Sequence, residues 1–554
     1  MAQHRVKSVE ASLRDTEQPE HRLSRNLSAL DLTVFGVGVI IGTGIFVLTG
    51  VVAKTQAGPA VALSFVVAGV VCGFAALCYA EFASTVPVAG SAYTFSYATF
   101  GEFIAWIIGW DLVLELALGA ATVSVGWSGY FNQLLGDLGI PLPASIAGET
   151  ATVNIPAMFI ALLMTGVLVL GIKLSSRVTT VIVAIKIAIV LLVIVLGLFY
   201  VQAANYSPFV PPSQPTSTTG GSALTAPLIQ LIAGFTPSTF GVGGIFAGAA
   251  IVFFAFIGFD IVATAAEETK NPKRDLPRGI IASLTVCTLL YVAVSLVVVG
   301  MQNYTELSTD APLAEAFRSV GLPFVSALIS VGALAGLTSV VMILMLGQSR
   351  VLFAMSRDHL LSPGLGAVHP RYRTPYRITI FTGIVVAVLG GLVPLGTLAE
   401  LVNIGTLFAF VLVSIGVIVL RRTRPDLHRS FRVPWVPVLP ILSAAACLWL
   451  MLNLPAETWL RFAIWMVIGL VLYFVYSRQH SRLAPGAAGG GEEVRRTASF
   501  GGAAPLAGGG PAGRGTMPPA GGAMPPAGGA MPPAGGGAPP AGGTAPPSRA
   551  DEPR

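Results

Sequence analysis

A lysine stands near the middle of a long apolar stretch of this 554-residue chain. Lys186 lies inside residues 178–199, which read VTTVIVAIKIAIVLLVIVLGLF, and the nearest polar group is residues 175–177. In a helix rising about 1.5 Å per residue, Lys186 would lie roughly 15 Å deep, near the centre of a ~30 Å hydrocarbon layer. An ionisable group at that depth is costly unless it faces a polar cavity and finds a partner. Lys186 is therefore a candidate functional residue.

Two other apolar stretches contain glycines in the middle of an expected helix. Residues 38–46 read GVIIGTGIF and residues 253–260 read FFAFIGFD. Interrupted helices at corresponding positions of two halves of a chain indicate an inverted-repeat transporter with its substrate site between them. The main-chain groups that such breaks free must line a cavity, because lipid cannot satisfy them. The alternative is that these glycines only allow close helix packing.

The chemistry of two such breaks suits an α-amino acid. Main-chain amides at the start of the second half-helix of the first break would bind a carboxylate, with help from the helix dipole. Freed carbonyl oxygens around both breaks would bind an ammonium group. The amides are those of Gly42, Thr43 and Gly44. The carbonyls are those near Ile40, Phe254, Ala255 and Ile257.

Carboxylates also lie within or beside these apolar stretches. Asp111 and Glu115 are four residues apart and share one helix face, so at least one of them should point at a cavity rather than at lipid. Asp260 directly follows the second break, where it could cap the new half-helix. Glu81 could pair with arginines on the cytoplasmic side, but the sequence does not name its partner.

The overall composition places these features in a membrane. Hydrophobic residues make up 54% of the chain, charged residues make up 10%, and the mean hydropathy is +0.77, whereas soluble chains carry about 25% charged residues. The N-terminal segment lacks the apolar core of a cleaved signal peptide. The four cysteines lie in apolar runs and predict packing rather than disulfides or metal binding.

Motifs of other functional classes are missing from the sequence. No glycine-rich phosphate-binding loop occurs, which argues against a nucleotide-driven pump, and no metal-ligand or nucleophile constellation occurs. We therefore expect no enzyme activity, no metal and no cofactor. The net charge of +6 lies mainly on the expected cytoplasmic loops and the tail. It indicates attraction to anionic lipid headgroups rather than to nucleic acid.

Apolar runs of about twenty residues predict an all-α integral membrane fold with about twelve transmembrane helices. The runs begin near Leu30, Ala60, Tyr93, Pro156, Ser176, Gly243, Gly279, Phe324, Ile378, Leu395, Val436 and Leu460. Lysine and arginine gather on the cytoplasmic side of membrane proteins. With the N-terminus inside, all but four of the 32 lie on cytoplasmic segments, and one of the four is Lys186. Both termini are therefore expected in the cytoplasm.

The predicted organisation of the chain follows from these spans. Residues 1–27 form a cytoplasmic segment, 28–203 a first five-helix half, 204–242 an extracellular loop, 243–420 a second five-helix half, and 421–480 two further helices. Residues 481–554 are dominated by glycine, proline and alanine, with MPPAGGA recurring. Such a composition buries too little apolar surface to offset its ordering entropy. We expect a disordered cytoplasmic tail.

Four segments together resemble one family of transporters. They are GVIIGTGIF (38–46), YAEFASTVPVAGSAY (79–93), FFAFIGFD followed by AAEETKNPKRDLPR (253–260 and 265–278), and SRVLFAMSRDHLL (349–361). They look like the amino acid–polyamine–organocation (APC) superfamily and, within it, the cationic amino acid transporter family with its bacterial amino acid permeases. The resemblance covers roughly residues 25–477.

This resemblance implies a fold and a role for Lys186. The fold is the LeuT-like one of sodium-coupled neurotransmitter transporters, with five plus five inverted helices and two added C-terminal helices. Lys186 would take the place of a sodium ion and bond to unwound carbonyls of the first span. Because a buried lysine can exchange its proton, Lys186 could couple transport to protons. A permanently charged structural pin is the alternative.

The resemblance also bears on three other residues. Glu115 matches a substrate-site position and could help to recognise a basic side chain, or it could simply bond to a neighbouring helix. Phe254 could form a gate stacked over the substrate, although buried phenylalanines usually only pack. For Asp260 we favour the structural role of a helix cap.

These observations predict a secondary active transporter of α-amino acids in the plasma membrane. We expect proton-coupled uptake of cationic or broad-range amino acids, with the proton gradient as the energy source. The expected partners are the substrate and the lipid bilayer, and the sequence names no protein partner. One alternative is a uniporter or exchanger. Another is a receptor that binds amino acids without moving them, although a receptor would need neither the helix breaks nor Lys186.

Overall fold

The computed structural model describes residues 27–483, except for 86–91, 94–95, 98–99, 144, 149–150, 172–175, 216–222, 236–237, 263–268, 426, 428 and 430. The described residues are almost entirely helical. The sheet among them is one antiparallel ladder of β1 (Gln214–Pro215) and β2 (Ser238–Thr239), in which Gln214 faces Thr239. The predicted tail beyond residue 483 and residues 1–26 lie outside the described part.

Eight helical stretches of the described residues are long and apolar enough to cross a membrane, and four further apolar helices are shorter. In chain order the helices are α2 (Ala29–Ile40), α3 (Thr49–Val52), α4 (Val61–Thr85), α6 (Glu102–Asp137), α7 (Ile155–Val169), α8 (Ser176–Gly197), α9 (Leu228–Ala233), α10 (Gly241–Val252), α11 (Phe259–Val262), α12 (Pro272–Met301), α13 (Pro312–Ser319), α14 (Pro323–Arg357), α15 (Tyr376–Leu392), α16 (Leu395–Thr423), α17 (Val438–Leu452), α18 (Ala456–Leu472) and α19 (Arg478–His480). The four shorter apolar ones are α2, α7, α15 and α17. An all-helical membrane protein is thus confirmed, whereas the number of twelve spans stays a prediction.

The first apolar helix has a complete start signal. The Ser28 hydroxyl accepts the Asp31 main-chain N–H, and the Asp31 carboxylate accepts the Ser28 main-chain N–H at 2.9 Å. This reciprocal capping box satisfies amides that a helix cannot pair within itself. It fixes the start of α2 at Ala29, one residue before the predicted start.

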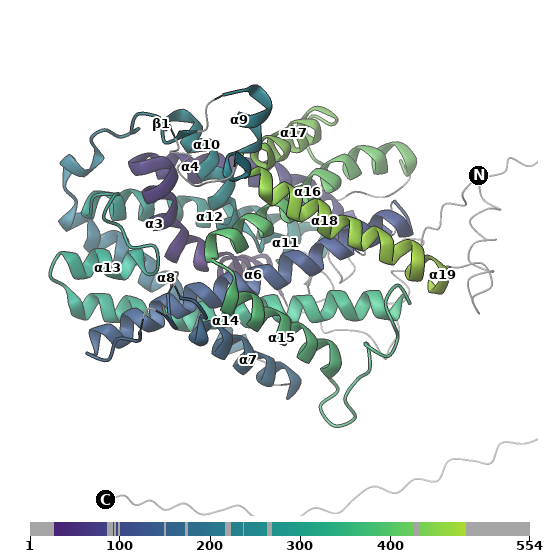
Figure 1. The fold of residues 1–554 in the computed structure, drawn as a ribbon. Coiled ribbons are helices and arrows are strands. Elements are labelled where there is room, and N and C mark those ends of the chain that lie inside the picture. The colour runs from purple at the N-terminus through teal and green to yellow at the C-terminus, as the bar shows by residue number, and fades with distance from the viewer. Residues whose placement is uncertain are drawn as a thin grey trace, which may run out of the picture. The chain divides into compact units, whose positions relative to one another are not determined.

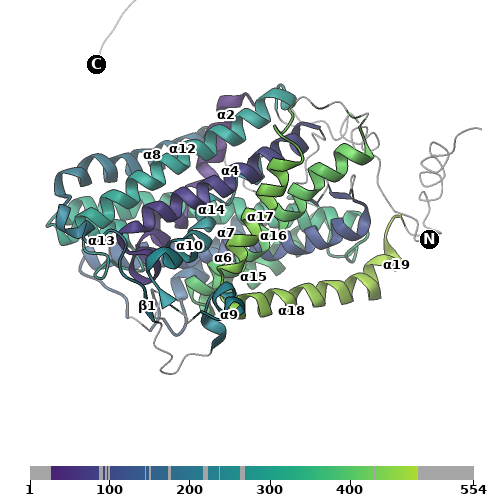
Figure 2. The ribbon, with the colours of Figure 1, turned by 90° about the horizontal axis from the view of Figure 1, so that it is seen from above.

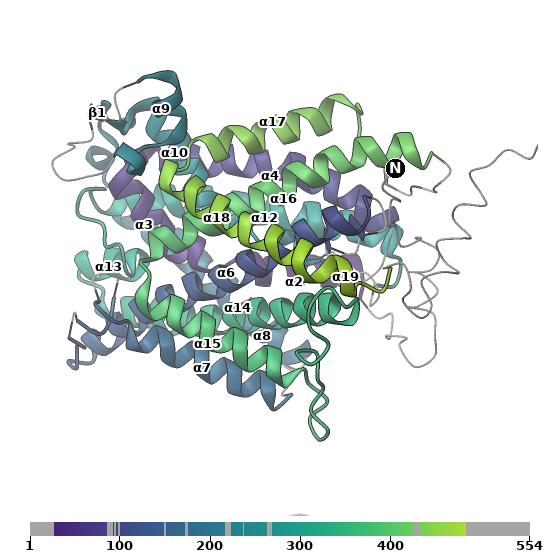
Figure 3. The same ribbon diagram turned by 45° about the vertical axis from the view of Figure 1, so that its right-hand side comes forward.

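The helices pack side by side around α6 and α4. α6 runs beside α14 and α16, and α15 lies along α7 (Figure 1, Figure 3). α4 packs against α12 and α10, and α12 in turn packs against α2 and α8 (Figure 2). α18 lies on the outside of this bundle against α6 and α16. Within this bundle the turns that follow α2 and α10, Gly44–Leu48 and Phe253–Phe256, contact each other and are buried.

Two predicted span starts differ from the structure by more than four residues. The third span was expected near Tyr93, but α6 begins at Glu102, directly after Gly101 with a φ of 87°. A residue with positive φ cannot continue a right-handed helix, so α6 does not extend back through Gly101. The seventh span was expected near Gly279, but α12 begins at Pro272, because proline suits the first turn of a helix even in a polar stretch.

Candidate functional site

The first predicted break is present at residues 41–43. α2 ends at Ile40, and the chain resumes as a π-helical turn at Gly44–Leu48 before α3. Ile41 has extended backbone angles, with φ −71° and ψ 98°. The Phe46 N–H then bonds to the Gly42 carbonyl at 3.3 Å as the helix resumes. The main chain here is thus released from the regular helical pattern deep inside the bundle.

The second predicted break is present after α10. The helix tightens into a 3₁₀ turn at Phe253–Phe256, Ile257 is extended, and α11 starts at Phe259. Gly258 has a φ of 116°, and a Cβ at this position would lie 2.6 Å from Val39 of α2. Both the backbone angle and the space therefore require glycine. The Asp260 carboxylate, in the first turn of α11, accepts the N–H of the preceding Gly258 at 3.2 Å, as the acidic residue of a capping box does.

The two breaks touch each other. A Cβ added to Gly44 would collide with the main chain of Ala255. The main chains of the two interrupted helices therefore pass each other at a distance that only glycine permits. Sequence analysis placed these two segments in one site, and the structure brings them into direct contact.

Lys186 of α8 lies against the first break. Its side chain is 1% exposed, and its Nζ donates to the carbonyl oxygens of Gly38 at 2.6 Å and Ile41 at 3.0 Å. In an uninterrupted helix these two carbonyls would accept from residues four positions later. The amine therefore occupies acceptors in the region where α2 ends. Gly336 of α14 leaves room for the aliphatic stem, since a Cβ there would lie 2.9 Å from the Lys186 Cε.

A small cavity lies where α2, α6, α14 and the second break meet. It is lined by Val39, Ile40, Gly42, Thr43, Gly44, Glu115, Gly119, Val123, Phe254, Ile257, Val340 and Leu344. The lining includes every predicted substrate-binding residue except Ala255, which packs against Gly44 instead. Among the described residues of this lining, Glu115 carries the only charged side chain.

The structure also shows a contributor that the sequence analysis missed. The hydroxyl of Tyr291, on α12, contacts the carbonyl oxygens of Ile40 at 2.7 Å and Ala255 at 2.9 Å. Two of the carbonyls expected to be free for an ammonium group thus already have a partner. One hydroxyl hydrogen serves both breaks. The feature of the sequence that could have indicated this role is a tyrosine inside the otherwise apolar run of α12.

The two carboxylates of α6 face different surroundings. Glu115 lines the cavity and lies near Thr406 of α16, whose hydroxyl donates to the Val402 carbonyl at 3.0 Å. Asp111 lies one turn earlier against Gly405 of α16, where a Cβ would approach its Oδ1 to 2.8 Å. Neither Asp111 oxygen has a hydrogen-bond partner among the described residues. Of this pair, only Glu115 is placed to meet a substrate.

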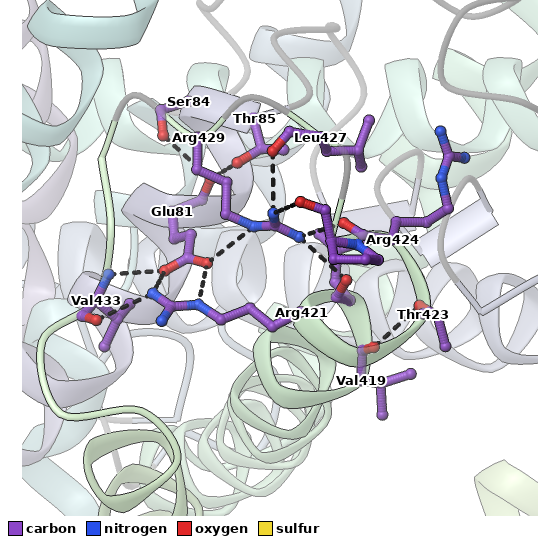
Figure 4. Close-up of polar contacts among 12 residues, drawn as sticks. Glu81, Ser84, Thr85, Val419, Arg421, Thr423, Arg424, Leu427, Arg429 and Val433 are labelled. Carbon is purple, nitrogen blue, oxygen red and sulfur yellow. Dashed lines mark hydrogen bonds and ion pairs between the residues drawn. The ribbon is translucent and has the colours of Figure 1, made fainter.

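Glu81 has partners that the sequence could not name. Arg421, near the end of α16, donates to both of its carboxylate oxygens, at 2.9 and 2.6 Å (Figure 4). The main-chain N–H of Val433 donates to the same carboxylate at 2.7 Å, and Arg429 Nε lies 3.6 Å away. Arg429 also donates to main-chain carbonyls at the end of α16, including those of Leu420 and Arg424. We call Glu81, Arg421, Arg429 and Val433 the Glu81 clasp.

No group of three or more potential metal-ligating side chains occurs among the described residues. Two interrupted helices that meet beside a buried cavity, within a set of membrane-length apolar helices, instead define the framework of a membrane transporter. The family model for amino acid permeases matches residues 27–474. The chain belongs to this family of the APC superfamily, whose members are transporters and not enzymes.

Similar proteins include transporters with different named substrates. A branched-chain amino acid permease, BcaP, of Bacillus subtilis is 50% identical over 487 residues, which cover 86% of this chain and 98% of the relative. A methylthioribose transporter of the same organism is 49% identical and covers 83% of this chain and 95% of its own length. A vacuolar cationic amino acid transporter 2 of Arabidopsis thaliana is 40% identical and covers 73% and 61%.

Proposed function

We propose that this permease takes up α-amino acids with neutral aliphatic side chains across the plasma membrane, driven by a proton gradient. The observation that carries the side-chain preference is an apolar part of the cavity lining. It consists of Gly119 and Val123 of α6 and Val340 and Leu344 of α14. Apolar walls favour apolar substrate groups. The 50% identity to a branched-chain amino acid permease points the same way.

The substrate's main-chain groups would bind at the two breaks. The amides of Gly42, Thr43 and Gly44 open the resumed helix beside the cavity, where a carboxylate gains from the helix dipole. An ammonium group would lie near the carbonyls of Ile40 and Phe254, using the lone pairs that are left beside the bonds from the Tyr291 hydroxyl and the Ile257 N–H. Glu115 is the carboxylate of the cavity lining that would accompany it. In this arrangement Glu115 pairs with the ammonium group that every α-amino acid carries. Binding then does not require a basic side chain on the substrate.

Proton coupling would operate through Lys186. Its Nζ holds two carbonyls where α2 ends, at 2.6 and 3.0 Å. A neutral amine makes weaker hydrogen bonds to carbonyls than an ammonium group does. Release of the proton would therefore loosen the first break, and uptake would tighten it. A permanently charged pin remains the alternative role.

The topology follows from charge and from the order of the helices. We assign the helices to twelve spans, in which α2 and α3 with the π-helical turn between them form the first span and α4 forms the second. α2 to α8 and α10 to α16 are the two inverted halves, and α17 and α18 are added. The lysine and arginine distribution supports a cytoplasmic position for both termini and for the Glu81 clasp. Substrate would move by rocking of one helix group around the cavity.

Other functions compete with this proposal. A uniporter or exchanger would use the same site without protons, and a receptor would bind without moving substrate. A second substrate class, methylthioribose, is supported by the 49% identity to the named transporter. Methylthioribose is a neutral sugar with an apolar thioether, so it would fit the apolar wall but would leave the main-chain site for carboxylate and ammonium unused.

Uptake into proteoliposomes separates these possibilities. Radiolabelled leucine, isoleucine, alanine, arginine, lysine and methylthioribose are offered with an inward proton gradient, with and without an ionophore. We expect accumulation of leucine and isoleucine that the ionophore abolishes. Uptake unaffected by the ionophore would replace symport by uniport or exchange. Uptake of methylthioribose alone would overturn the amino acid assignment, and binding without uptake would indicate a receptor.

A further inference from the structure

Asn403, in α16, holds the segment where α10 changes its helical form. Its side chain is fully buried. Its amide donates to the carbonyl oxygens of Ala250 at 2.8 Å and Ile251 at 2.9 Å. Both N–H groups of the Asn403 side chain thus donate hydrogen bonds to two successive main-chain carbonyls of another helix.

The position of these carbonyls explains why they need a partner. They belong to the last turn of α10, directly before the 3₁₀ turn Phe253–Phe256. A change from α to 3₁₀ geometry re-assigns carbonyl acceptors from the fourth to the third following residue, with poorer hydrogen-bond geometry. Water is scarce in the core of a membrane protein. The Asn403 amide supplies bonds that the distorted helix makes less well.

We propose that Asn403 is a positioning residue that fixes the path of the second break. Phe254 and Ile257 follow the held carbonyls within a few residues and line the cavity. The Asn403 contacts therefore fix the positions of these two cavity-lining residues. The role in substrate binding rests on the proposed function of the cavity, whereas the role in holding the break does not.

The test replaces Asn403 by leucine, which has a similar size and no amide. The matched control is Ser414→Ala, which removes a buried polar contact of the same helix with Ser443, away from the cavity. Hydrogen exchange of the main-chain amides reports local opening. We expect exchange over residues 253–258 to quicken about tenfold or more in Asn403→Leu and to stay unchanged in Ser414→Ala. Unchanged protection of residues 253–258 in Asn403→Leu would overturn the proposal.

A second readout addresses the substrate. In Asn403→Leu the KM of every transported compound should rise by about tenfold, with the order of preference kept, because the break contacts groups that all substrates share. A loss of Vmax alone would argue against a role in binding. If the wild-type protein transports nothing in the panel, the proposed function fails, and the exchange experiment still decides the role of Asn403. Asn403→Asp, which keeps the shape, serves if the leucine variant does not fold.

The Glu81 clasp supports a second and independent inference. Glu81 is 1% exposed and lies at the end of α4, whereas Arg421 lies at the end of α16 (Figure 4). α4 and α16 pack against each other, and both also contact α10 and α17. The clasp therefore joins the ends of two adjacent helices.

An aromatic layer lies between the cavity and the clasp along these helices. Tyr79 of α4 meets Phe259 of α11 and Phe410 of α16 edge-on, with ring centroids 6.0 and 5.7 Å apart. Phe259 and Phe410 are 5.0 Å apart. Along α16, Phe410 stands between Thr406, which lies near Glu115, and Arg421. Three rings and then an ion pair thus fill the space where α4, α11 and α16 converge.

We infer that the Glu81 clasp is a latch that keeps α4 and α16 together and that opens when the cavity opens on that side. A buried ion pair resists separation because each charge would be left unpaired, unless water reaches both. Arg421 is partly exposed, with 26% of its side chain accessible. Water can therefore enter from the arginine side and replace the bonds as the helices part.

Native Cys78 provides the probe for this latch. It is buried on α4, one turn from Glu81 and near Ser414 and Ser443. With the other three cysteines replaced by alanine, a small charged thiol reagent measures how often α4 separates from α16 and α17. Reaction requires exposure of the thiol. Labelling does not depend on transport, so its outcome stands whether or not the proposed function is correct.

Glu81→Gln weakens the latch but keeps its shape. We expect labelling of Cys78 to quicken about fivefold or more relative to the parent protein. The control is Glu457→Gln, which breaks the more exposed 3.0 Å pair with Arg461 on α18, and it should leave the rate unchanged. Equal rates in Glu81→Gln and its parent would overturn the latch. Equal acceleration in both variants would do the same by showing general loosening. Arg421→Gln repeats the test from the other side of the pair.

Discussion

Trp110 of α6 and Trp465 of α18 are locked to each other by two reciprocal hydrogen bonds. Their rings stack with centroids 4.3 Å apart and planes 12° apart. The Trp110 indole N–H donates to the Trp465 carbonyl at 2.9 Å, and the Trp465 indole N–H donates to the Trp110 carbonyl at 3.2 Å. This pair fixes the last apolar helix to the helix that carries Glu115.

Replacing Trp465 by alanine should loosen α18 without touching the cavity. A half-buried aromatic ring and the hydrogen bond that its indole N–H donates are lost, whereas the Trp465 carbonyl that accepts from Trp110 remains, so we expect a loss of about 2 kcal/mol of stability. Thermal unfolding of the purified protein, followed by size-exclusion chromatography, measures the change. Trp465→Phe keeps the stacking but loses the hydrogen bond that the indole donates. Its stability should therefore lie between those of the parent protein and of Trp465→Ala. A melting temperature equal to that of the parent would show that the pair does not hold α18.

Replacing Lys186 by methionine should abolish proton-driven accumulation and leave a folded protein. The methionine retains the length of the stem beside Gly336 but cannot donate to Gly38 and Ile41. Uptake with and without a pH gradient should become equal in the variant. The same uptake measured at several pH values should also lose its dependence on pH. Wild-type accumulation by Lys186→Met would exclude a coupling role.

Gly44 and Gly42 should respond differently to the same added methyl group. At Gly44 the methyl group would collide with the main chain of Ala255, so the two breaks must separate and binding of every amino acid should be lost. At Gly42 it would meet Val340 at 3.6 Å, an ordinary contact. Binding measured with the same radiolabelled panel compares the two. Normal affinity in Gly44→Ala would refute the close approach of the breaks as a requirement for binding.

Gly119→Ala should shrink the side-chain end of the cavity. The new methyl group would lie 3.5 Å from Leu344, which leaves the helices in place, and alanine also favours the helix. We expect KM for leucine and isoleucine to rise by about tenfold and KM for alanine to change little, the size expected for about one methyl group. An equal change for all three substrates would place their side chains elsewhere.

The elements that the sequence predicted well are those with local signals. The glycines within two apolar stretches located both breaks, and the depth of Lys186 singled it out. Residues that act across long stretches of sequence could not be found in this way. Tyr291 bonds to main-chain groups 36 and 251 residues away, and a single tyrosine in an apolar run is equally compatible with packing. Asn403 was missed for the same reason, since its partners are carbonyls 153 and 152 residues away.

Other misses have different physical causes. The start of α6 was misplaced because the aromatic stretch before Gly101 is apolar enough to resemble a membrane helix, while a backbone angle ends it. The partners of Glu81 could not be chosen, because many arginines share one end of the bundle and only packing selects Arg421 and Arg429. Family resemblance supplied the acceptors of Lys186, which spacing alone could not.

The cavity lining has two parts, the main chain of the two breaks and the side chains of α6 and α14. Substitutions can alter one part without altering the other. Main chain from the two breaks contributes one part of the lining, and substitutions change it only where they move the breaks, as at Gly44 or Asn403. Side chains of α6 and α14 form the other part, and small substitutions there alter the room without moving the breaks. Substitutions in duplicated genes can therefore change the substrate while the two helix breaks keep their structure. This gives a physical reason why close relatives can carry names of chemically different substrates.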